Sequence, residues 1–143
     1  MFGLEVHLGS RSTVFIVDVQ PGISAILYHL IRQNSSLDVI VVSISELVPM
    51  TIAARPQAFI ALSGGNNLNY LGMMTTLRAM GFNSPWIVVS AALADAGIAL
   101  TLGASGFVHM CDLEAEMGAA IAVAGAGGTY ISSNAYCRME APL

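Results

Sequence analysis

Five short apolar runs, separated by helix-like segments, constrain the fold of this chain more than any other feature. Each run is continuous rather than alternating and is rich in β-branched or aromatic residues, as is typical of strands buried on both faces of a parallel sheet. The sequence therefore predicts five parallel strands, at residues 13–17, 39–42, 58–62, 86–89 and 106–110.

Helical patterns fill the intervals between these runs. The clearest follows Pro21, where Ile and Leu recur on one helix face and a proline in the first turn suits a helix start. Weaker patterns cover residues 46–54, 67–81 and 92–102, and a last helix begins near Asp112, a good N-cap residue. The alternation predicts an α/β fold of (βα)5 type, a single doubly wound parallel sheet with helices on both faces.

The 143 residues suffice for one domain with a full hydrophobic core. The alternating pattern occupies residues 12–128. We expect residues 1–11 to be an N-terminal extension and residues 129–143 to be a linker or tail.

Charge is scarce: 55% of the residues are hydrophobic and 10% are charged, with a net charge of −4. The five basic residues are all arginine and are scattered, so the chain lacks the clustered basic face that binding of nucleic acid by itself would need. Glycines and polar residues interrupt its long uncharged stretches, whereas a membrane span needs about 20 mostly apolar residues. Cys111 and Cys137 lie far apart, which predicts neither a disulfide framework nor a zinc site. We expect a reduced cytoplasmic protein without a membrane span.

Five segments in register resemble the receiver domain of response regulators, with the LuxR-type (NarL/FixJ) subfamily as the nearest. They read VFIVDVQP, RPQAFIAL, SPWIVVSA, LGASGFV and GAGGTYIS, at residues 14–21, 55–62, 84–91, 102–108 and 125–132. The resemblance implies the receiver, or flavodoxin-like, topology. In such sheets ligands bind at the carboxyl ends of the strands.

Receivers that accept a phosphoryl group have an acidic pair after strand one, a nucleophilic aspartate ending strand three, a Ser or Thr after strand four and a lysine after strand five. A carboxylate that attacks a phosphoryl dianion needs a divalent cation and an ammonium group to neutralise the developing charge. The resemblance places these positions on Asp18 with Val19, Leu62, Ser90 and Met110.

Three of these positions have lost their charged group, and the chain contains no lysine. A shift of one residue at Leu62 stays open, although no acid lies between Glu46 and Asp95. We therefore expect a degenerate phosphorylation pocket with no catalytic residue, no bound metal and no cofactor.

The resemblance then implies a non-phosphorylated, atypical receiver-like domain of a LuxR-type transcription regulator rather than an enzyme. Such a domain acts as a homodimer or on another protein partner, and reaches DNA only through a helix-turn-helix domain that this chain lacks. Because low charge leaves apolar surface, and apolar patches mark interfaces, we expect a dimer interface on helical faces that carry Ile26, Leu30, Ala119, Ala122 and Val123. The small-residue helix at 92–102 together with the strand at 106–110 is the other candidate face.

The alternative function is the sensing of a small molecule in the degenerate pocket. Leu62 and Met110 would form its apolar floor, and Asp18, Ser63 and Ser90 its rim. An enzyme or cofactor carrier on a flavodoxin-like fold is disfavoured, because no cobalamin or flavin-phosphate signature follows any strand.

Three other features are assigned structural roles rather than functional ones. We expect His109 to be packed or partner-facing rather than a base, and Cys111, next to Asp112, to be unreactive because the neighbouring carboxylate disfavours a thiolate. The glycine-containing segment 63–67 is predicted to be a plain loop, since it matches no phosphate-binding pattern.

Overall fold

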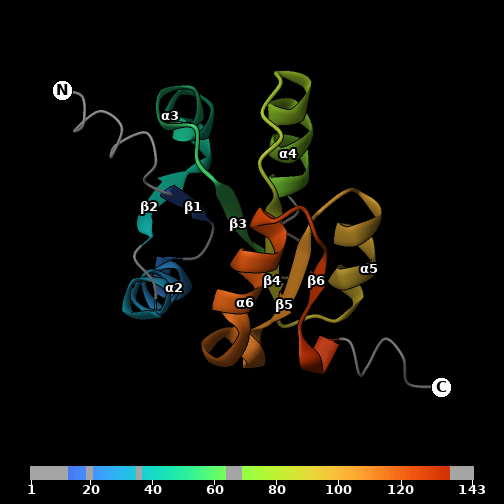
Figure 1. Ribbon diagram of the computed structural model, residues 1–143. Helices are drawn as coiled ribbons and strands as arrows, with labels where there is room; N and C mark the ends of the chain where they lie inside the picture. The colour runs from blue at the N-terminus through green and yellow to red at the C-terminus, as the bar shows by residue number, and fades with distance from the viewer. Residues whose placement is uncertain (1–12, 19–20, 35–36, 64–68, 136–143) are drawn as a thin grey trace.

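A computed structural model describes residues 13–18, 21–34, 37–63 and 69–135 (Figure 1). At residues 18, 21–23, 34 and 69 the description covers the backbone alone. The predicted N-terminal extension, Val19 and the end of the predicted tail lie outside these ranges.

One parallel sheet of six strands, in the order β2–β1–β3–β4–β5–β6, forms the centre of the structure. The five predicted runs coincide with the first five strands to within one residue at nearly every end. The strands are β1 (Thr13–Asp18), β2 (Asp38–Ser43), β3 (Ala58–Ser63), β4 (Trp86–Ser90), β5 (Gly106–His109) and β6 (Tyr130–Ile131).

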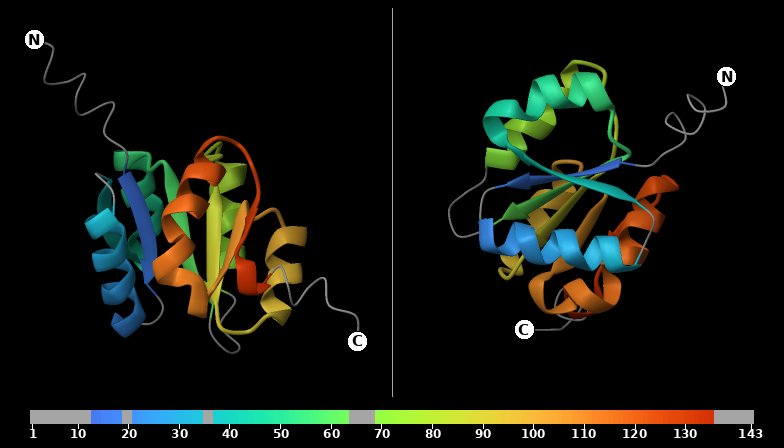
Figure 2. Two further views of the ribbon diagram at one scale, coloured as in Figure 1. Left: turned by 60° about the horizontal axis from the view of Figure 1, so that its bottom comes forward. Right: turned by 90° about the vertical axis from the view of Figure 1, so that its left-hand side faces the viewer.

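Helices cover both faces of this sheet, as a doubly wound fold requires. The helices α2 and α6 lie on one face, and α3 and α4 lie on the opposite face (Figure 2). Residues of α5 belong to the same core layer as those of α4. The bounds are α2 (Pro21–Asn34), α3 (Leu47–Ala54), α4 (Asn69–Ala79), α5 (Ala94–Thr101) and α6 (Leu113–Gly125), with short 3-10 turns η1 (Ile44–Glu46) and η2 (Met110–Asp112) before α3 and α6.

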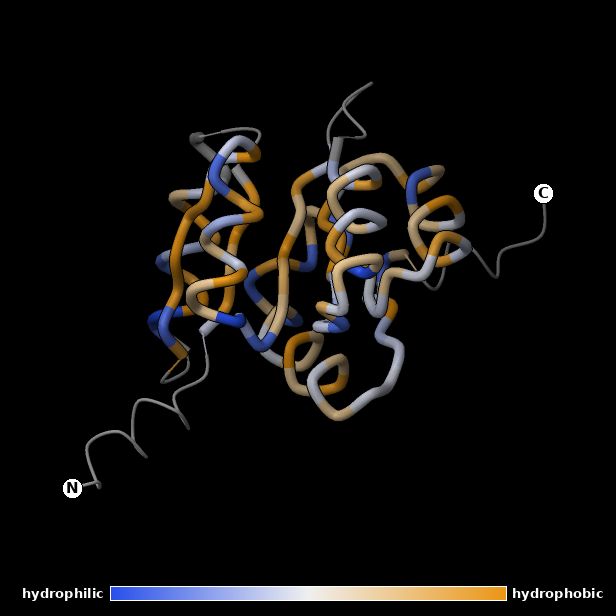
Figure 3. The backbone as a smooth tube through the Cα atoms, turned by 90° about the horizontal axis from the view of Figure 1, so that it is seen from above, coloured by the Kyte–Doolittle hydropathy of each residue, from blue (hydrophilic) through white to orange (hydrophobic). Residues whose placement is uncertain are grey.

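The two core layers differ in chemistry. The layer beneath α2 and α6 is aliphatic, built on residues such as Val14, Ile16 and Ile60. The layer beneath α3, α4 and α5 is aromatic: Trp86 stacks on Phe59 with ring centroids 4.5 Å apart, and Phe59 meets Phe15 edge to face at 6.0 Å. Strongly hydrophilic positions are few and scattered over the described chain (Figure 3).

The predicted count of five strands is wrong, because residues of the expected linker add a sixth. Tyr130 and Ile131 pair in parallel with Gly106 and Phe107 of β5. Beyond them, the side chains of Ser132 and Ala135 are fully buried. A run of two residues after a glycine-rich segment carries no strand periodicity, so sequence alone did not reveal β6.

Among the described residues, no helix combines the length and the apolar character that crossing a membrane would require.

Candidate functional site at the carboxyl ends of the strands

Leu62 lies in the hydrophobic core rather than in an open pocket. Its side chain is 2% exposed and belongs to the aliphatic layer beneath α2 and α6, together with Val89 and Val108. The resemblance places the phosphoryl-accepting aspartate at this position, and the structure has a buried aliphatic side chain there.

Two serines end the neighbouring strands β3 and β4 and lie side by side, since Ser63 pairs with Ser90 in the sheet register. Both are almost completely buried. Ser63 Oγ donates a hydrogen bond to Asp95 Oδ2 at 2.9 Å, and Ser90 Oγ donates to the same oxygen at 2.7 Å. The amide of Ala92 in turn donates to Ser90 Oγ at 3.0 Å. One carboxylate oxygen thus joins two strand ends to the first turn of α5.

This arrangement satisfies a carboxylate that is 8% exposed. A buried charge is tolerated when hydrogen bonds compensate its lost hydration, and the amino end of a helix also favours an anion. Each serine has a single hydroxyl proton, and both protons are already donated to Asp95. Neither serine can donate to an incoming anion unless this bond breaks.

Asp95 is the functional residue that sequence reasoning missed. It follows β4 by five residues and sits inside a helix, so counting along strand ends does not reach it. The available signal was its isolation, because it is the one acid between Glu46 and Asp112.

Tyr70 of α4 adds a buried hydroxyl close to the same network. Burial raises the pKa of Tyr70, the polar interaction with Ser63 acts in the opposite direction, and the negative charge of Asp95 raises the pKa further. Its hydroxyl has no hydrogen-bond partner within the described part of the chain. The phenol is therefore held in its neutral form.

Of the other predicted pocket residues, Met110 is described with its side chain, whereas Val19 lies outside the described ranges. Met110 lies in η2 and packs against the aliphatic layer on the α2–α6 side, whereas Ser90 is bonded on the α5 side. The backbone of Asp18 ends β1 opposite Ser43, and its side chain is outside the description. The pocket formed jointly by Asp18, Val19, Leu62, Ser90 and Met110 remains a prediction.

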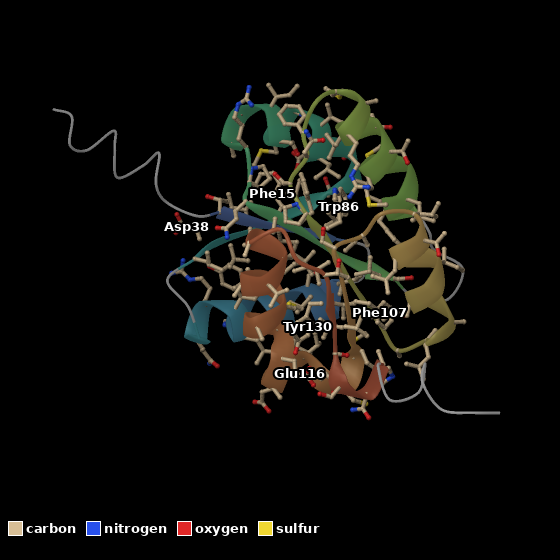
Figure 4. All side chains as sticks on the ribbon, turned by 45° about the vertical axis from the view of Figure 1, so that its right-hand side comes forward. Phe15, Asp38, Trp86, Phe107, Glu116 and Tyr130 are labelled. Carbon is tan, nitrogen blue, oxygen red and sulfur yellow. The ribbon has the colours of Figure 1, made fainter. Side chains whose placement is uncertain are left out.

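A second polar cluster joins β6 and the residues after it to α6. Tyr130 Oη donates to Glu116 Oε1 at 2.5 Å, and these two side chains lie next to one another in Figure 4. The amide of Ser133 donates to both oxygens of Glu116, at 3.0 and 3.1 Å. Burial, the hydrogen bond to Glu116 and the nearby carboxylates raise the pKa of Tyr130 to about 12.

Asp112 takes part in this cluster instead of capping α6. It occupies the N-cap position but makes no side-chain capping bond to that helix. Its carboxylate accepts from the backbone N of Asn134 at 3.0 Å and from Nδ2 of Asn134 at 2.7 Å. Burial raises the pKa of Asp112, but hydrogen bonds with Ser132 and Asn134 and the nearby His109 outweigh it and leave the pKa lowered. The expected capping role is wrong, because the carboxylate accepts from Asn134 of the chain after β6 instead of from the helix.

His109 and Cys111 border a polar cavity of about 340 Å³ at the carboxyl ends of β4 and β5, which Ala91, Leu93 and Asn134 complete. The Nδ1 atom of His109 accepts the backbone N–H of Cys111 at 3.1 Å. Cys111 is a free, exposed thiol. Nowhere in the described ranges do three or more His, Cys, Asp or Glu residues come together as metal ligands.

The five residues predicted at a dimer interface lie on α2 and α6, which pack side by side on one face of the sheet. Ile26 is 56% exposed, and Ala119 and Ala122 are exposed as well. Leu30 and Val123 are partly buried. Between the helices runs an apolar groove with cavities of about 350 and 410 Å³, both lined by Leu30, Leu113 and Glu114.

No protein-family model matches the sequence, and no curated protein sequence matches it. Solved structures do match. The isolated receiver domain of RcsB from Salmonella enterica serovar Typhimurium, solved with a phosphomimetic beryllofluoride, gives a TM-score of 0.73 at 15% identity and covers 90% of this chain and 98% of that one. A LuxR-family two-component response regulator from an Aurantimonas species gives 0.73 at 18% identity, covering 90% and 94%.

Longer RcsB chains match over part of their length. A structure of two RcsB dimers bound to two parallel DNAs gives a TM-score of 0.74 at 15% identity and covers 92% of this chain and 69% of that one. In the structure of a Salmonella typhimurium RcsB response regulator, this chain spans 66% of the regulator. These likenesses show that the chain has the fold of a receiver domain.

Proposed function

We propose that this chain, folded as a receiver domain, is a regulatory module that works without phosphoryl transfer, as the atypical receiver of a LuxR-type transcription regulator. The observation that carries the proposal is the bonding of Ser63 and Ser90 to Asp95 beside a core-buried Leu62. The site holds its own carboxylate in place of an open phosphorylation pocket.

The chemistry of phosphoryl transfer supports this assignment. The reaction needs a carboxylate nucleophile and positive charges that stabilise the transferring group. The ends of β3, β4 and β5 present Leu62, Ser63, Ser90 and His109, and no lysine exists anywhere in the chain to pair with a phosphoryl group. The carboxylate of Asp95, which lies at the ends of β3 and β4, already accepts two hydroxyl donors.

A receiver that does not switch chemically acts through its surfaces. The exposed Ile26, Ala119 and Ala122 beside the apolar α2–α6 groove suit a contact with a second copy, and a regulator of similar fold is found as DNA-bound dimers. In this proposal a separate helix-turn-helix domain would contact DNA, since the scattered arginines of this chain give no basic face.

Phosphoryl donors test the proposal directly. The protein is incubated with acetyl phosphate or beryllofluoride and magnesium, and its mass, oligomeric state and melting temperature are measured. We expect no change in any of them. The isolated RcsB receiver, whose structure was solved in the presence of beryllofluoride, is the positive control. A magnesium-dependent gain of one phosphoryl group, or a donor-dependent change in oligomeric state, would refute the proposal.

Ligand sensing is a second candidate, favoured by the polar cavity beside His109, Cys111 and Asn134. A ligand that binds only the native state raises stability by about 2.7 kcal/mol at 100 times its dissociation constant. A metabolite screen by thermal shift tests this idea, with Ala91→Trp as the variant that fills the cavity. A hit that persists in Ala91→Trp, or no hit at all, counts against this site.

A further inference from the structure

The two edges of the sheet are built differently. At one edge, β6 is two residues long, and the chain after it is bonded to Asp112 and Glu116. At the other edge, β2 is six residues long and pairs with β1 along its whole length, from Asp38 to Ser43. No described strand pairs with the outer side of β2, which runs across the front of the right-hand view in Figure 2, between α3 above and α2 below.

The outer strand β2 has a charged residue only at its first position, Asp38, and lacks the other features that normally prevent pairing at an edge. Edge strands are usually protected by shortness, a charge, a proline or a bulge. Between Asp38 and Ser43 this strand reads Val-Ile-Val-Val, in continuous register with β1. Val41 is 40% exposed, one of the few large apolar side chains of the described chain that solvent reaches. A long, flat, apolar edge of this kind is a template for another strand.

We propose that β2 pairs with β2 of a second copy of this chain, antiparallel across a twofold axis, so that the two six-stranded sheets become continuous. This surface is separate from the α2–α6 groove, and it does not depend on whether the receiver accepts phosphoryl groups.

The alternation of side chains limits the register of this pairing. Val39 packs in the layer beneath α2 and α6, whereas Val42 packs in the layer beneath α3. Val41 has the same parity as Val39 and faces the α2–α6 side. A twofold axis normal to the sheet keeps each face of the joined sheet continuous. Two residues paired across the axis must therefore point to the same face, which means that both have odd numbers or both have even numbers. Placing Val41 opposite its own copy meets this condition and buries the exposed side chain.

Charge at the two ends of β2 also suits an antiparallel pair. At the amino end, Arg32 lies 3.6 Å from Asp38 with its side chain 49% exposed. At the carboxyl end, Ser43 Oγ donates to the exposed Glu46 at 3.4 Å. Antiparallel pairing sets the amino end of one strand beside the carboxyl end of the other, which brings Arg32 and its partner Asp38 toward Glu46 of the second copy, twice per dimer, so that Arg32 faces two carboxylates.

Disulfide trapping tests the register. In a chain with Cys111→Ser and Cys137→Ser, Val41→Cys is oxidised and run on a non-reducing gel. Cβ atoms of directly opposed residues lie about 4.5–5.5 Å apart, so we expect a covalent dimer. The matched control is Ile52→Cys, which lies on α3 and is 50% exposed, against 40% for Val41. Equal crosslinking at both positions, or none at Val41→Cys, would overturn the proposal.

A charged variant tests the surface without a crosslink. The molar mass of the full chain is measured by light scattering over a dilution series. We expect Val41→Lys to raise the dimer dissociation constant at least about tenfold, equivalent to about 1.4 kcal/mol, while Ile26→Lys in the α2–α6 groove leaves the edge contact intact. A chain that is monomeric at every concentration refutes the pairing. A dimer that dissociates only with Ile26→Lys also refutes the pairing. The finding that residues 1–12 or a strand of another protein cover the outer edge of β2 refutes it as well.

Discussion

A single oxygen of Asp95 holds the ends of two strands, because Ser63 and Ser90 both donate to it. The network forms a buried polar joint between β3, β4 and α5. Its stability contribution is therefore concentrated in one side chain.

We expect Asp95→Ala to lower the free energy of unfolding by about 1–3 kcal/mol, because two buried hydroxyls lose their acceptor. Urea denaturation followed by circular dichroism measures the change. Asp38→Ala, which removes the partly exposed ion pair with Arg32, is the matched control and should cost less than about 1 kcal/mol. Equal losses in the two variants would show that the serine bonds contribute nothing.

Gly103 is the second residue whose identity the structure explains. Its φ of +105° is unfavourable for other residues, and a Cβ there would collide with Nη1 of Arg78. Arg78 reaches from α4 to the end of α5 and donates to the carbonyl of Gly103 at 2.6 Å. Because Gly103 has no Cβ, the side chain of Arg78 from α4 can cap the carboxyl end of α5.

We expect Gly103→Ala to destabilise the protein by more than about 1 kcal/mol, since it strains the backbone and displaces Arg78. Gly97→Ala serves as the comparison, because Gly97 lies within α5 with open space around its Cα. That change should stabilise the helix by about 0.5–1 kcal/mol. Thermal denaturation of both variants decides the point, and a neutral Gly103→Ala would contradict it.

At the scale of elements, two carboxylates of η2 and α6 fix the chain that follows β6. Asp112 holds Asn134, and Glu116 holds Tyr130 and Ser133. The direction in which the chain leaves the sheet is therefore set by side chains rather than by backbone pairing alone.

This attachment should depend on pH. The pKa of Asp112 is lowered from its ordinary value of 3.8, so the carboxylate stabilises the fold above that value and loses its effect as pH falls through the lowered pKa. We expect Asp112→Asn to cost about 1 kcal/mol at pH 7 and progressively less in strong acid. Denaturation at pH 7 and pH 3, with the exposed Glu114→Gln as control, measures it. A cost independent of pH would contradict this account.

Sequence patterns predicted most of the helices and strands because short stretches of neighbouring residues specify them. Continuous β-branched runs gave the first five strands, and Pro21 marked the start of α2. The sixth strand and the role of Asp112 depend on contacts between residues 109–116 and 130–134, which no local pattern encodes. For the same reason Asp95 escaped notice, whereas Leu62 and Ser90 were placed correctly at the strand ends.

At the scale of the whole molecule, the last strand closes one side of the sheet. A chain that stops after Gly128 would lack β6 and expose the edge of β5. A chain that stops after Ala135 keeps β6 and its pairing with β5. We expect the shorter chain to be less stable by on the order of 7 kcal/mol, at about 1 kcal/mol for each of the seven hydrogen-bond donors whose bonds to or from residues 129–135 are lost, and more prone to aggregate. Comparing their denaturation midpoints and light scattering tests this expectation, and matching values would refute it.

Trp86 gives the molecule an optical reporter of its own integrity. It is the only tryptophan, it is fully buried, and it stacks on Phe59 in the middle of the sheet. Its emission therefore comes from one place and one environment, without overlapping signals from other indoles. Separation of β3 from β4 would red-shift that emission, so the opening of these two strands can be followed in the unlabelled protein.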